Sequence, residues 1–247
     1  MIPGPAESPP GLAFSRSAST NAAVFTMFRK SGRPSPLRAR IGAQVAATLA
    51  ANPAIRPIAA PGVQAFCHDN FLNAATCRAL IARIDAGRRP STLLSDKPEQ
   101  NFRTSESCDL ERWAPDIRPV DEAIAALLGI APEQGETIQG QRYAPGQQFR
   151  AHHDYFFETQ SYWRKVTAQG GQRTWTAMVY LCDVEEGGAT WFPQAGFRIA
   201  PKRGLLLAWN NMAADGSPNA LTLHEGMPVS AGVKYIITKW FRERSWL

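Results

Sequence analysis

The sequence predicts an α+β fold in which helices come first and a double-sheet β structure, a jelly roll or barrel, follows. Helical periodicity occupies two stretches before residue 130, and from about residue 136 short apolar runs alternate with Gly, Pro and Asn. Several short strands with turn residues between them are typical of closed or double-sheet β structures. Because the helices precede the strands and do not alternate with them, a parallel α/β arrangement is not indicated.

The first sixty residues are predicted to form a basic, largely disordered extension, and residues 61–247 a single folded domain. Residues 1–40 are rich in Pro, Ser, Gly, Ala and Arg without sustained periodicity, and a short helix is expected over residues 41–51. Residues 1–66 carry seven basic and one acidic side chain, which leaves 20 of each for the remainder. A nucleic-acid-binding face on the folded part is therefore not indicated. The role of the extension and the true start codon stay open.

Two helices are expected to support the sheet. Asn73 is suited to cap a helix in which Cys77, Leu80 and Ile84 follow the helical repeat. A second helix is predicted from about Asp116 to Leu128, with its apolar residues along one side. Both helices are expected to bury these apolar faces against the strands that follow.

The β-rich part is predicted to contain eight short strands. They are expected over residues 137–143, 149–156, 176–184, 189–192, 197–199, 205–209, 221–224 and 233–241. The polar connection between residues 157 and 173 is expected to be a mobile substrate lid, and a solvated connection without function is the alternative.

The cysteines and the hydropathy indicate a cytoplasmic protein. The four cysteines, at positions 67, 77, 108 and 182, form no CxxC pair, so free thiols in a reducing compartment are expected. No run of 18 or more apolar residues occurs, so neither a transmembrane helix nor a membrane partner is expected. Nothing in the sequence indicates the oligomeric state.

A metal site is predicted at His152, Asp154 and His224. Residues two apart on a strand face the same side, so His152 and Asp154 are expected to project together, and His224 is the third ligand. Two histidines and a carboxylate on one face form the facial triad of non-haem Fe(II) oxygenases, which leaves positions open for co-substrates. Such a short match also arises by chance, in which case these would be ordinary polar residues. His68 is interpreted as a surface residue.

Lys234 is predicted to bind an anion beside the metal. It begins the expected strand over residues 233–241, where Ile236, Thr238 and Trp240 share its face, so its ammonium group would lie among largely buried neighbours. A buried lysine is costly unless an anion compensates it. A dicarboxylate co-substrate that chelates the metal at one end would supply that anion, whereas a lysine reaching outward from the rim is the alternative.

Four blocks of sequence resemble the catalytic alpha subunits of prolyl 4-hydroxylases. They are RTS (residues 103–105), QRYAPGQQF followed by HHDYF (141–149 and 152–156), YLCDVEEGGATWFP (180–193), and HEGMPV followed by GVK (224–229 and 232–234). The resemblance covers roughly residues 62–247. It implies a double-stranded β-helix, Fe(II), 2-oxoglutarate, O2 and L-ascorbate, and a hydrogen bond from Tyr143 to a co-substrate carboxylate. Phe149 stands where the family often has tyrosine, and Glu225 to Met227 where it more often has small residues.

The resulting hypothesis is an Fe(II)- and 2-oxoglutarate-dependent dioxygenase that hydroxylates prolyl residues in a peptide or protein. Its catalytic residues are the metal ligands alone, and Arg103 and Trp163 are expected to contact the substrate. One alternative keeps the chemistry but replaces the substrate with a free amino acid or small metabolite, since a fold does not specify its substrate. A second alternative is a non-catalytic metal-binding β-barrel module. A zinc hydrolase is weaker, because no motif places a carboxylate as general base.

Overall fold

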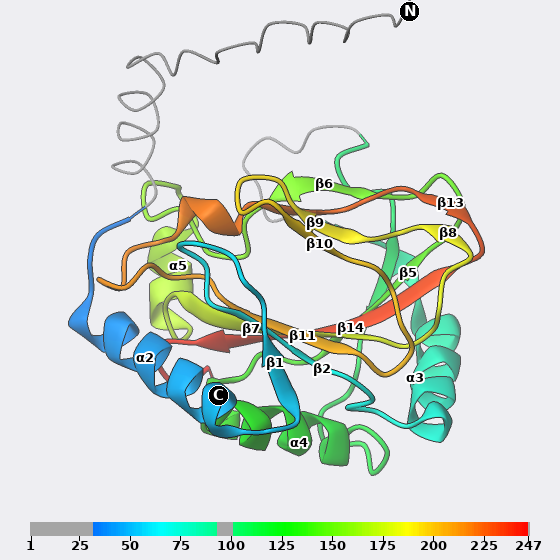
Figure 1. Cartoon of the computed structure of the whole chain (residues 1–247), viewed down its shortest axis with the longest axis horizontal. Helices are drawn as coiled ribbons and strands as arrows, with labels where there is room; N and C mark the ends of the chain where they lie inside the picture. Colours follow the sequence, from blue (N-terminus) through cyan, green and yellow to red (C-terminus); the bar gives the residue numbers. More distant parts are fainter. Residues whose placement is uncertain (1–31, 93–100, 247) are drawn as a thin grey trace, which may run out of the picture.

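The computed structural model describes residues 32–92 and 101–246, in which two large antiparallel sheets and one two-stranded sheet are formed (Figure 1). The eight-stranded major sheet lies in the middle of the molecule and a four-stranded minor sheet lies against one of its faces. The other face is covered by the helices α2 (Pro36–Ala51), α3 (Ala74–Gly87) and α4 (Arg118–Leu128). This arrangement confirms the predicted α+β class and the double-stranded β-helix. The helices do not simply precede the strands, because four short strands between residues 55 and 109, which the sequence did not predict, alternate with them and join the major sheet.

Within the described residues, the strands fall into three sheets. In spatial order the major sheet contains β1 (Ile55–Pro57), β2 (Ala65–His68), β11 (Leu206–Asn210), β7 (Arg173–Tyr180), β14 (Lys234–Arg242), β5 (Gln139–Tyr143), β4 (Glu106–Asp109) and β3 (Arg89–Pro90). The minor sheet contains β10 (Phe197–Ile199), β9 (Thr190–Phe192), β12 (His224–Gly226) and β6 (Phe149–His152). A two-stranded sheet pairs β13 (Val229–Ala231) with β8 (Glu186–Gly187).

The major sheet separates two apolar cores because successive side chains of a strand point to opposite faces. On β7, Trp175 and Val179 pack in the core between the sheet and the helices. Met178 and Tyr180, from the same strand, pack in the core between the two sheets. The second core is the one that borders the functional site.

Both predicted supporting helices are present. The α3 helix (Ala74–Gly87) is capped by Asn73, whose Oδ1 accepts a hydrogen bond from the Thr76 amide at 2.9 Å. The α4 helix (Arg118–Leu128) begins two residues later than expected and ends at Gly129, which adopts a left-handed conformation with φ 66°. Their buried residues belong to the helix-side core, as the periodicity predicted.

The folded body begins well before the predicted boundary at residue 60. The α2 helix (Pro36–Ala51) buries Val45 and Leu49 in the helix-side core, and β1 pairs with β2 in the major sheet. Arg38 is buried because its Nη1 lies 2.8 Å from Glu158 Oε1, and Glu243 is also close. The short helix expected over residues 41–51 is present but begins earlier, at Pro36. The acidic partners of Arg38 are far away in sequence, so composition alone suggested disorder up to residue 40. Residues 1–31 lie outside the described part of the chain.

Three local predictions need correction. The strand expected over residues 149–156 ends at His152, and the connection that follows contains a short helix, α5 (Trp163–Ala168). The strand expected over 221–224 is instead a 3-10 helix, η2 (Ala220–Thr222), and β12 starts only at His224. Asn219 explains this turn, since its Oδ1 accepts from the Leu221 amide and its carbonyl accepts from the Thr222 hydroxyl.

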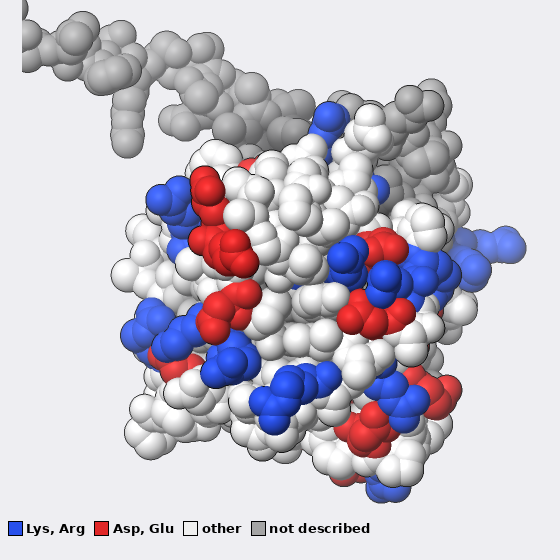
Figure 2. All heavy atoms as spheres, turned by 90° about the vertical axis from the view of Figure 1, so that its right-hand side faces the viewer, with Lys and Arg blue, Asp and Glu red and all other residues white. Residues whose placement is uncertain are grey.

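Charged side chains of both signs share the surface. On the face drawn in Figure 2, basic and acidic side chains are interspersed. The four cysteines are free thiols. None of the helices in the described ranges is both long and apolar enough to cross a membrane.

Candidate metal and co-substrate site

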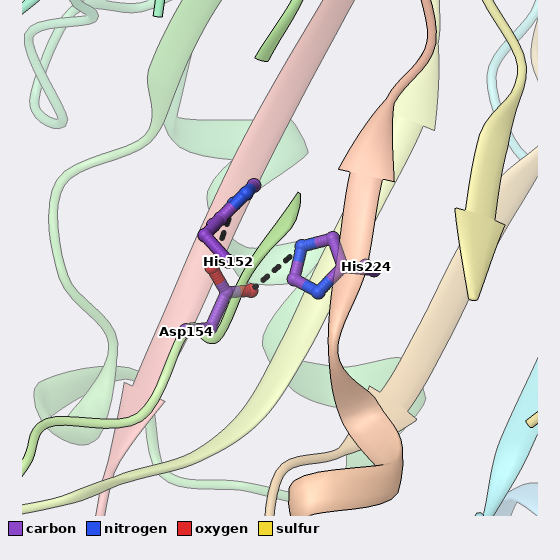
Figure 3. A group of neighbouring side chains, drawn as sticks. All are labelled: His152, Asp154 and His224. Carbon is purple, nitrogen blue, oxygen red and sulfur yellow. Dashed lines mark ion pairs between the residues drawn. The ribbon is translucent and has the colours of Figure 1, made fainter. Parts of the chain in front are cut away.

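His152, Asp154 and His224 come together between the two sheets (Figure 3). Their ligand atoms lie within 4.8 Å of one another. His152 Nε2 is 3.8 Å from Asp154 Oδ1, and His224 Nε2 is 3.9 Å from Asp154 Oδ2. The histidines are cross-strand partners at the end of β6 and the start of β12, whereas Asp154 lies just past the end of β6. The convergence was predicted correctly, although the shared strand proposed as its cause ends before Asp154.

Backbone carbonyl groups set the tautomer of both histidines. His152 Nδ1 lies 2.8 Å from the Arg150 carbonyl oxygen, and His224 Nδ1 lies 2.9 Å from that of Thr222. Because a carbonyl only accepts, each Nδ1 must carry the hydrogen, and each Nε2 is left with a free lone pair. Burial also lowers the pKa of His152 well below 6.5, which favours the neutral ring that a metal requires.

Asp154 is buried and is held in its ionised form. Burial by itself would raise its pKa, but His224, His152, Arg173 and the hydrogen bond from Thr176 together outweigh burial and lower the pKa. The Thr176 hydroxyl donates to Asp154 Oδ2 at 2.7 Å. Two imidazole nitrogens and one carboxylate on one side of a metal suit a divalent transition metal such as Fe(II) and leave coordination positions open.

Lys234 shares a cavity with the three residues. We call this space the site cavity, and the rest of its lining is Arg103, Gln141, Tyr143, Phe149, Met178, Thr190, Trp209, Gly226, Ile236, Thr238 and Trp240. The predicted face-mates of Lys234 therefore all line the same space.

The ammonium group of Lys234 lacks a carboxylate partner. The side chain is 1% exposed, and no carboxylate among the described residues lies within ion-pair distance of it. Its Nζ lies 5.1 Å from the ring centre of Tyr143 and 5.6 Å from that of Tyr180. Burial lowers the pKa of Lys234 from 10.5 to about 7. A buried cation with aromatic neighbours and no carboxylate partner fits a site for an anionic group.

Tyr143 lies beside Lys234 but its hydroxyl has an internal partner. Tyr143 Oη donates to Gln141 Oε1 at 2.7 Å, and Gln141 Nε2 donates to Thr238 Oγ1 at 3.2 Å. Burial raises the pKa of Tyr143, so the phenol stays protonated and able to donate. A carboxylate bound next to Lys234 would therefore compete with Gln141 for the hydrogen of the Tyr143 hydroxyl.

Of the two residues expected to contact the substrate, Arg103 lines the site cavity and Trp163 does not. Arg103 donates from Nη2 to Gln139 Oε1 at 2.8 Å and from Nε to Ser105 Oγ at 3.1 Å, and its guanidinium lies 4.8 Å from the ring centre of Phe149. No described carboxylate forms an ion pair with Arg103. Trp163 lies on α5 and does not line the site cavity.

Sequence reasoning missed the groups that surround the triad. Besides Thr176, Arg173 approaches Asp154, since its Nη1 lies 3.5 Å from the Asp154 carbonyl oxygen while Glu136 accepts from its Nε at 2.6 Å. The alternation along β7 could have indicated Thr176, because Thr176 and Met178 lie on the same face of that strand. No local pattern indicates Glu136, which reaches Arg173 from outside β7.

Comparisons with known proteins agree with this geometry. Residues 138–242 match the family model described as the 2OG-Fe(II) oxygenase superfamily. The chain is 34% identical over 203 residues to probable prolyl 4-hydroxylase 8 of Arabidopsis thaliana, which covers 72% of this chain and 68% of the plant protein. It is 29% identical over 180 residues to a putative prolyl 4-hydroxylase of Acanthamoeba polyphaga mimivirus, covering 72% and 74% of the two chains.

Solved structures show the same fold. The viral collagen prolyl hydroxylase of Paramecium Bursaria Chlorella virus-1, solved as a 2OG complex, superposes with a TM-score of 0.57 and 26% identity, over 72% of this chain and 95% of the viral one. A Pseudomonas putida prolyl-4-hydroxylase superposes with a TM-score of 0.52 and 21% identity, over 83% of this chain and all of the bacterial one, and supports the fold alone.

Proposed function

The chain is a prolyl 4-hydroxylase-like member of the 2OG-Fe(II) oxygenase superfamily, and from this premise we propose that it hydroxylates prolyl residues in a peptide or protein. The observation that carries the proposal is the site cavity, which combines the His152–Asp154–His224 triad with the unpaired ammonium group of Lys234. A metal-binding module without this chemistry has no need of a buried cation beside its metal ligands.

The residues divide the binding of metal and co-substrate between them. His152 and His224 would hold Fe(II) through their free Nε2 lone pairs, and Asp154 would supply the anionic ligand. Lys234 would bind the far carboxylate of 2-oxoglutarate with help from the Tyr143 hydroxyl. When bound, the iron and 2-oxoglutarate with O2 supply the oxidising chemistry, in which 2-oxoglutarate becomes succinate and CO2 and the substrate C–H becomes C–OH. L-Ascorbate is proposed as the accessory reductant.

The protein must also position the substrate and exclude unproductive oxidation. Arg103 and Phe149 border the cavity next to His152, since the Phe149 ring stacks on that imidazole with centroids 3.5 Å apart. We assign Arg103 to the substrate, because among the described residues its Nη1 makes a single long contact, 3.5 Å to the Thr92 carbonyl oxygen. Carbonyl oxygens of an extended peptide are suitable acceptors for a guanidinium. Trp163 is not assigned a role.

Anaerobic absorption spectroscopy tests the co-substrate site directly. Fe(II) is added to the purified full chain, followed by 2-oxoglutarate, with His224→Ala as the control. A visible metal-to-ligand charge-transfer band in the wild type that is absent from the variant is the expected result. A folded, iron-loaded wild type without such a band would contradict the proposed chelation and favour the binding-module alternative.

A mass-spectrometric assay then separates the substrate classes. A proline-rich peptide and free proline are each incubated with the enzyme, Fe(II), 2-oxoglutarate, ascorbate and O2. Addition of one oxygen atom to the peptide and not to free proline is expected, and the reverse preference would support the small-metabolite alternative. Ascorbate is left out of a parallel reaction to test its role. The cytoplasmic location stays a prediction.

A further inference from the structure

The three triad side chains are held in place in different ways. Both histidines are oriented by backbone carbonyl groups two residues earlier in the chain, at Arg150 on β6 and at Thr222 at the end of η2. Asp154 is oriented by a side chain from the opposite sheet, because the Thr176 hydroxyl of β7 donates to its Oδ2. A side-chain substitution cannot remove the backbone carbonyl groups that orient the histidines, but it can remove the hydroxyl that orients Asp154.

Thr176 is itself oriented by Asn211. The Asn211 Nδ2 group donates to Thr176 Oγ1 at 2.9 Å, and both side chains are fully buried. The hydroxyl has one hydrogen, which it gives to Asp154, so the Asn211 amide must present its NH2 group to the hydroxyl. The hydrogen bonds therefore run in one direction, from Asn211 through Thr176 to Asp154.

The orientation of Asn211 leaves an acceptor without a partner. Among the described residues, Asn211 Oδ1 is buried and receives no hydrogen bond. An unpaired buried acceptor costs roughly 1–3 kcal/mol, so this orientation of the amide is unfavourable for Asn211 Oδ1 itself. The observed orientation is the one that directs the Thr176 hydrogen toward Asp154.

We propose that Thr176, held by Asn211, is a positioning residue that fixes the Asp154 carboxylate for metal binding. The hydrogen bond engages Oδ2, which lies 3.9 Å from His224 Nε2, and fixes the carboxylate so that Oδ1 lies 3.8 Å from His152 Nε2. Because Oδ2 already accepts a hydrogen bond, we expect the carboxylate to bind a metal through one oxygen, which would keep the remaining coordination positions open for co-substrates. Groups that orient metal ligands typically change metal affinity by about 10–100-fold when removed. This inference rests on the metal site of the proposed function.

Metal titration of two threonine variants tests the role, with Co(II) as an oxygen-stable probe that has visible d–d bands. Thr176→Val keeps the shape of the side chain and removes the hydroxyl, and we expect about 10–100-fold weaker Co(II) binding and altered d–d bands. Thr176→Ser retains a hydroxyl and is expected to bind Co(II) with nearly wild-type affinity and an unchanged spectrum.

Thr174→Val is the matched control. Thr174 lies on the same strand and is equally buried, but its hydroxyl donates to the Phe241 carbonyl oxygen at 3.2 Å and not to Asp154. We expect this variant to bind Co(II) like the wild type, which separates orientation of the carboxylate from a general loss of packing or of a buried hydroxyl.

The outcomes are decisive in either direction. A folded Thr176→Val protein with wild-type affinity and spectrum would overturn the proposal, as would equal losses in Thr176→Val and Thr174→Val. If Thr176→Val does not fold, Asn211→Ala takes its place, with a several-fold loss of affinity expected and an unchanged Kd and spectrum contradicting the role. A wild type that binds no Co(II), or binds it equally after His224→Ala, would overturn the metal site itself and this role with it.

Discussion

Two buried lysines on β14 show how the two faces of the major sheet differ. Lys239 points to the helix side, is 0% exposed, and donates from Nζ to Asp121 Oδ1 at 2.5 Å and to the Glu136 carbonyl oxygen at 3.1 Å. Lys234 is 1% exposed and points to the site cavity, where no described carboxylate pairs with it. The same side chain on the same strand is thus neutralised by the protein on one face and left unpaired on the other.

The difference teaches how to distinguish a structural charge from a ligand-binding one. Burying an ion is compensated only when a counter-charge and hydrogen bonds come with it. The helix side supplies both for Lys239, with Arg112 as a further partner of Asp121 at 3.1 Å. Among the described residues, the cavity side supplies aromatic rings and no carboxylate for Lys234, so an anionic ligand is the compensation that we expect.

Replacement of Lys234 should have the largest effect on co-substrate binding. We expect Lys234→Met to weaken 2-oxoglutarate binding by about 100–1000-fold, because the far carboxylate would lose its buried charge partner. The ligand-free variant should be at least as stable as the wild type, since an uncompensated charge has been removed. Titration of the Fe(II) charge-transfer band and thermal unfolding measure the two quantities. Unchanged affinity in the folded variant would contradict the assignment of Lys234.

Lys239→Met should have the opposite pattern. It leaves the buried Asp121 without its closest partner, and because Arg112 remains, we expect a loss in the free energy of unfolding of about 2 kcal/mol, below the roughly 3–5 kcal/mol for a fully unpaired ion. Chemical denaturation measures this loss. The 2-oxoglutarate affinity of the folded protein should stay within about twofold of the wild type. A stable Lys239→Met protein with poor co-substrate binding would contradict the structural role assigned to Lys239.

The contrast between these lysines was only half predictable from the sequence. The two-residue repeat places Lys234 with Ile236, Thr238 and Trp240 on one face, and all four line the cavity. The partner of Lys239 is Asp121 on α4, more than a hundred residues earlier, and no local pattern joins them. The same limit explains α2, whose Arg38 is buried against distant acidic residues. Periodicity predicts which face a residue occupies, whereas ion pairs between distant segments depend on the completed fold.

The pH dependence of co-substrate binding tests whether Lys234 binds 2-oxoglutarate in its charged form. Burial lowers the pKa of Lys234 to about 7, so the ammonium form that binds a carboxylate is lost as the pH rises through that value. We expect 2-oxoglutarate affinity to fall by about fivefold between pH 7 and pH 8. Calorimetric titration across this range measures it, and Lys234→Met should show no such dependence.

The contribution of Lys234 to the free energy of unfolding should increase with pH, whereas 2-oxoglutarate affinity should decrease. Between about pH 7 and 10.5 the unfolded chain keeps the Lys234 proton while the folded, ligand-free protein has released it. Because the unfolded state then binds more protons, the contribution of Lys234 to the free energy of unfolding increases with pH in this window. The difference between wild type and Lys234→Met isolates this contribution from that of Lys239. A difference that does not vary with pH would contradict the lowered pKa.

The smallest expected effect concerns the polar partner of the co-substrate site. Tyr143 donates its hydrogen to Gln141, so 2-oxoglutarate must compete for it. Gln141→Leu removes the acceptor and should strengthen 2-oxoglutarate binding by about threefold, measured with the charge-transfer band. Adding Tyr143→Phe to each background forms a double-mutant cycle: loss of the hydroxyl should cost more affinity in Gln141→Leu than in the wild type. Equal losses would mean that Gln141 does not restrain Tyr143, and that Lys234 alone recognises the carboxylate.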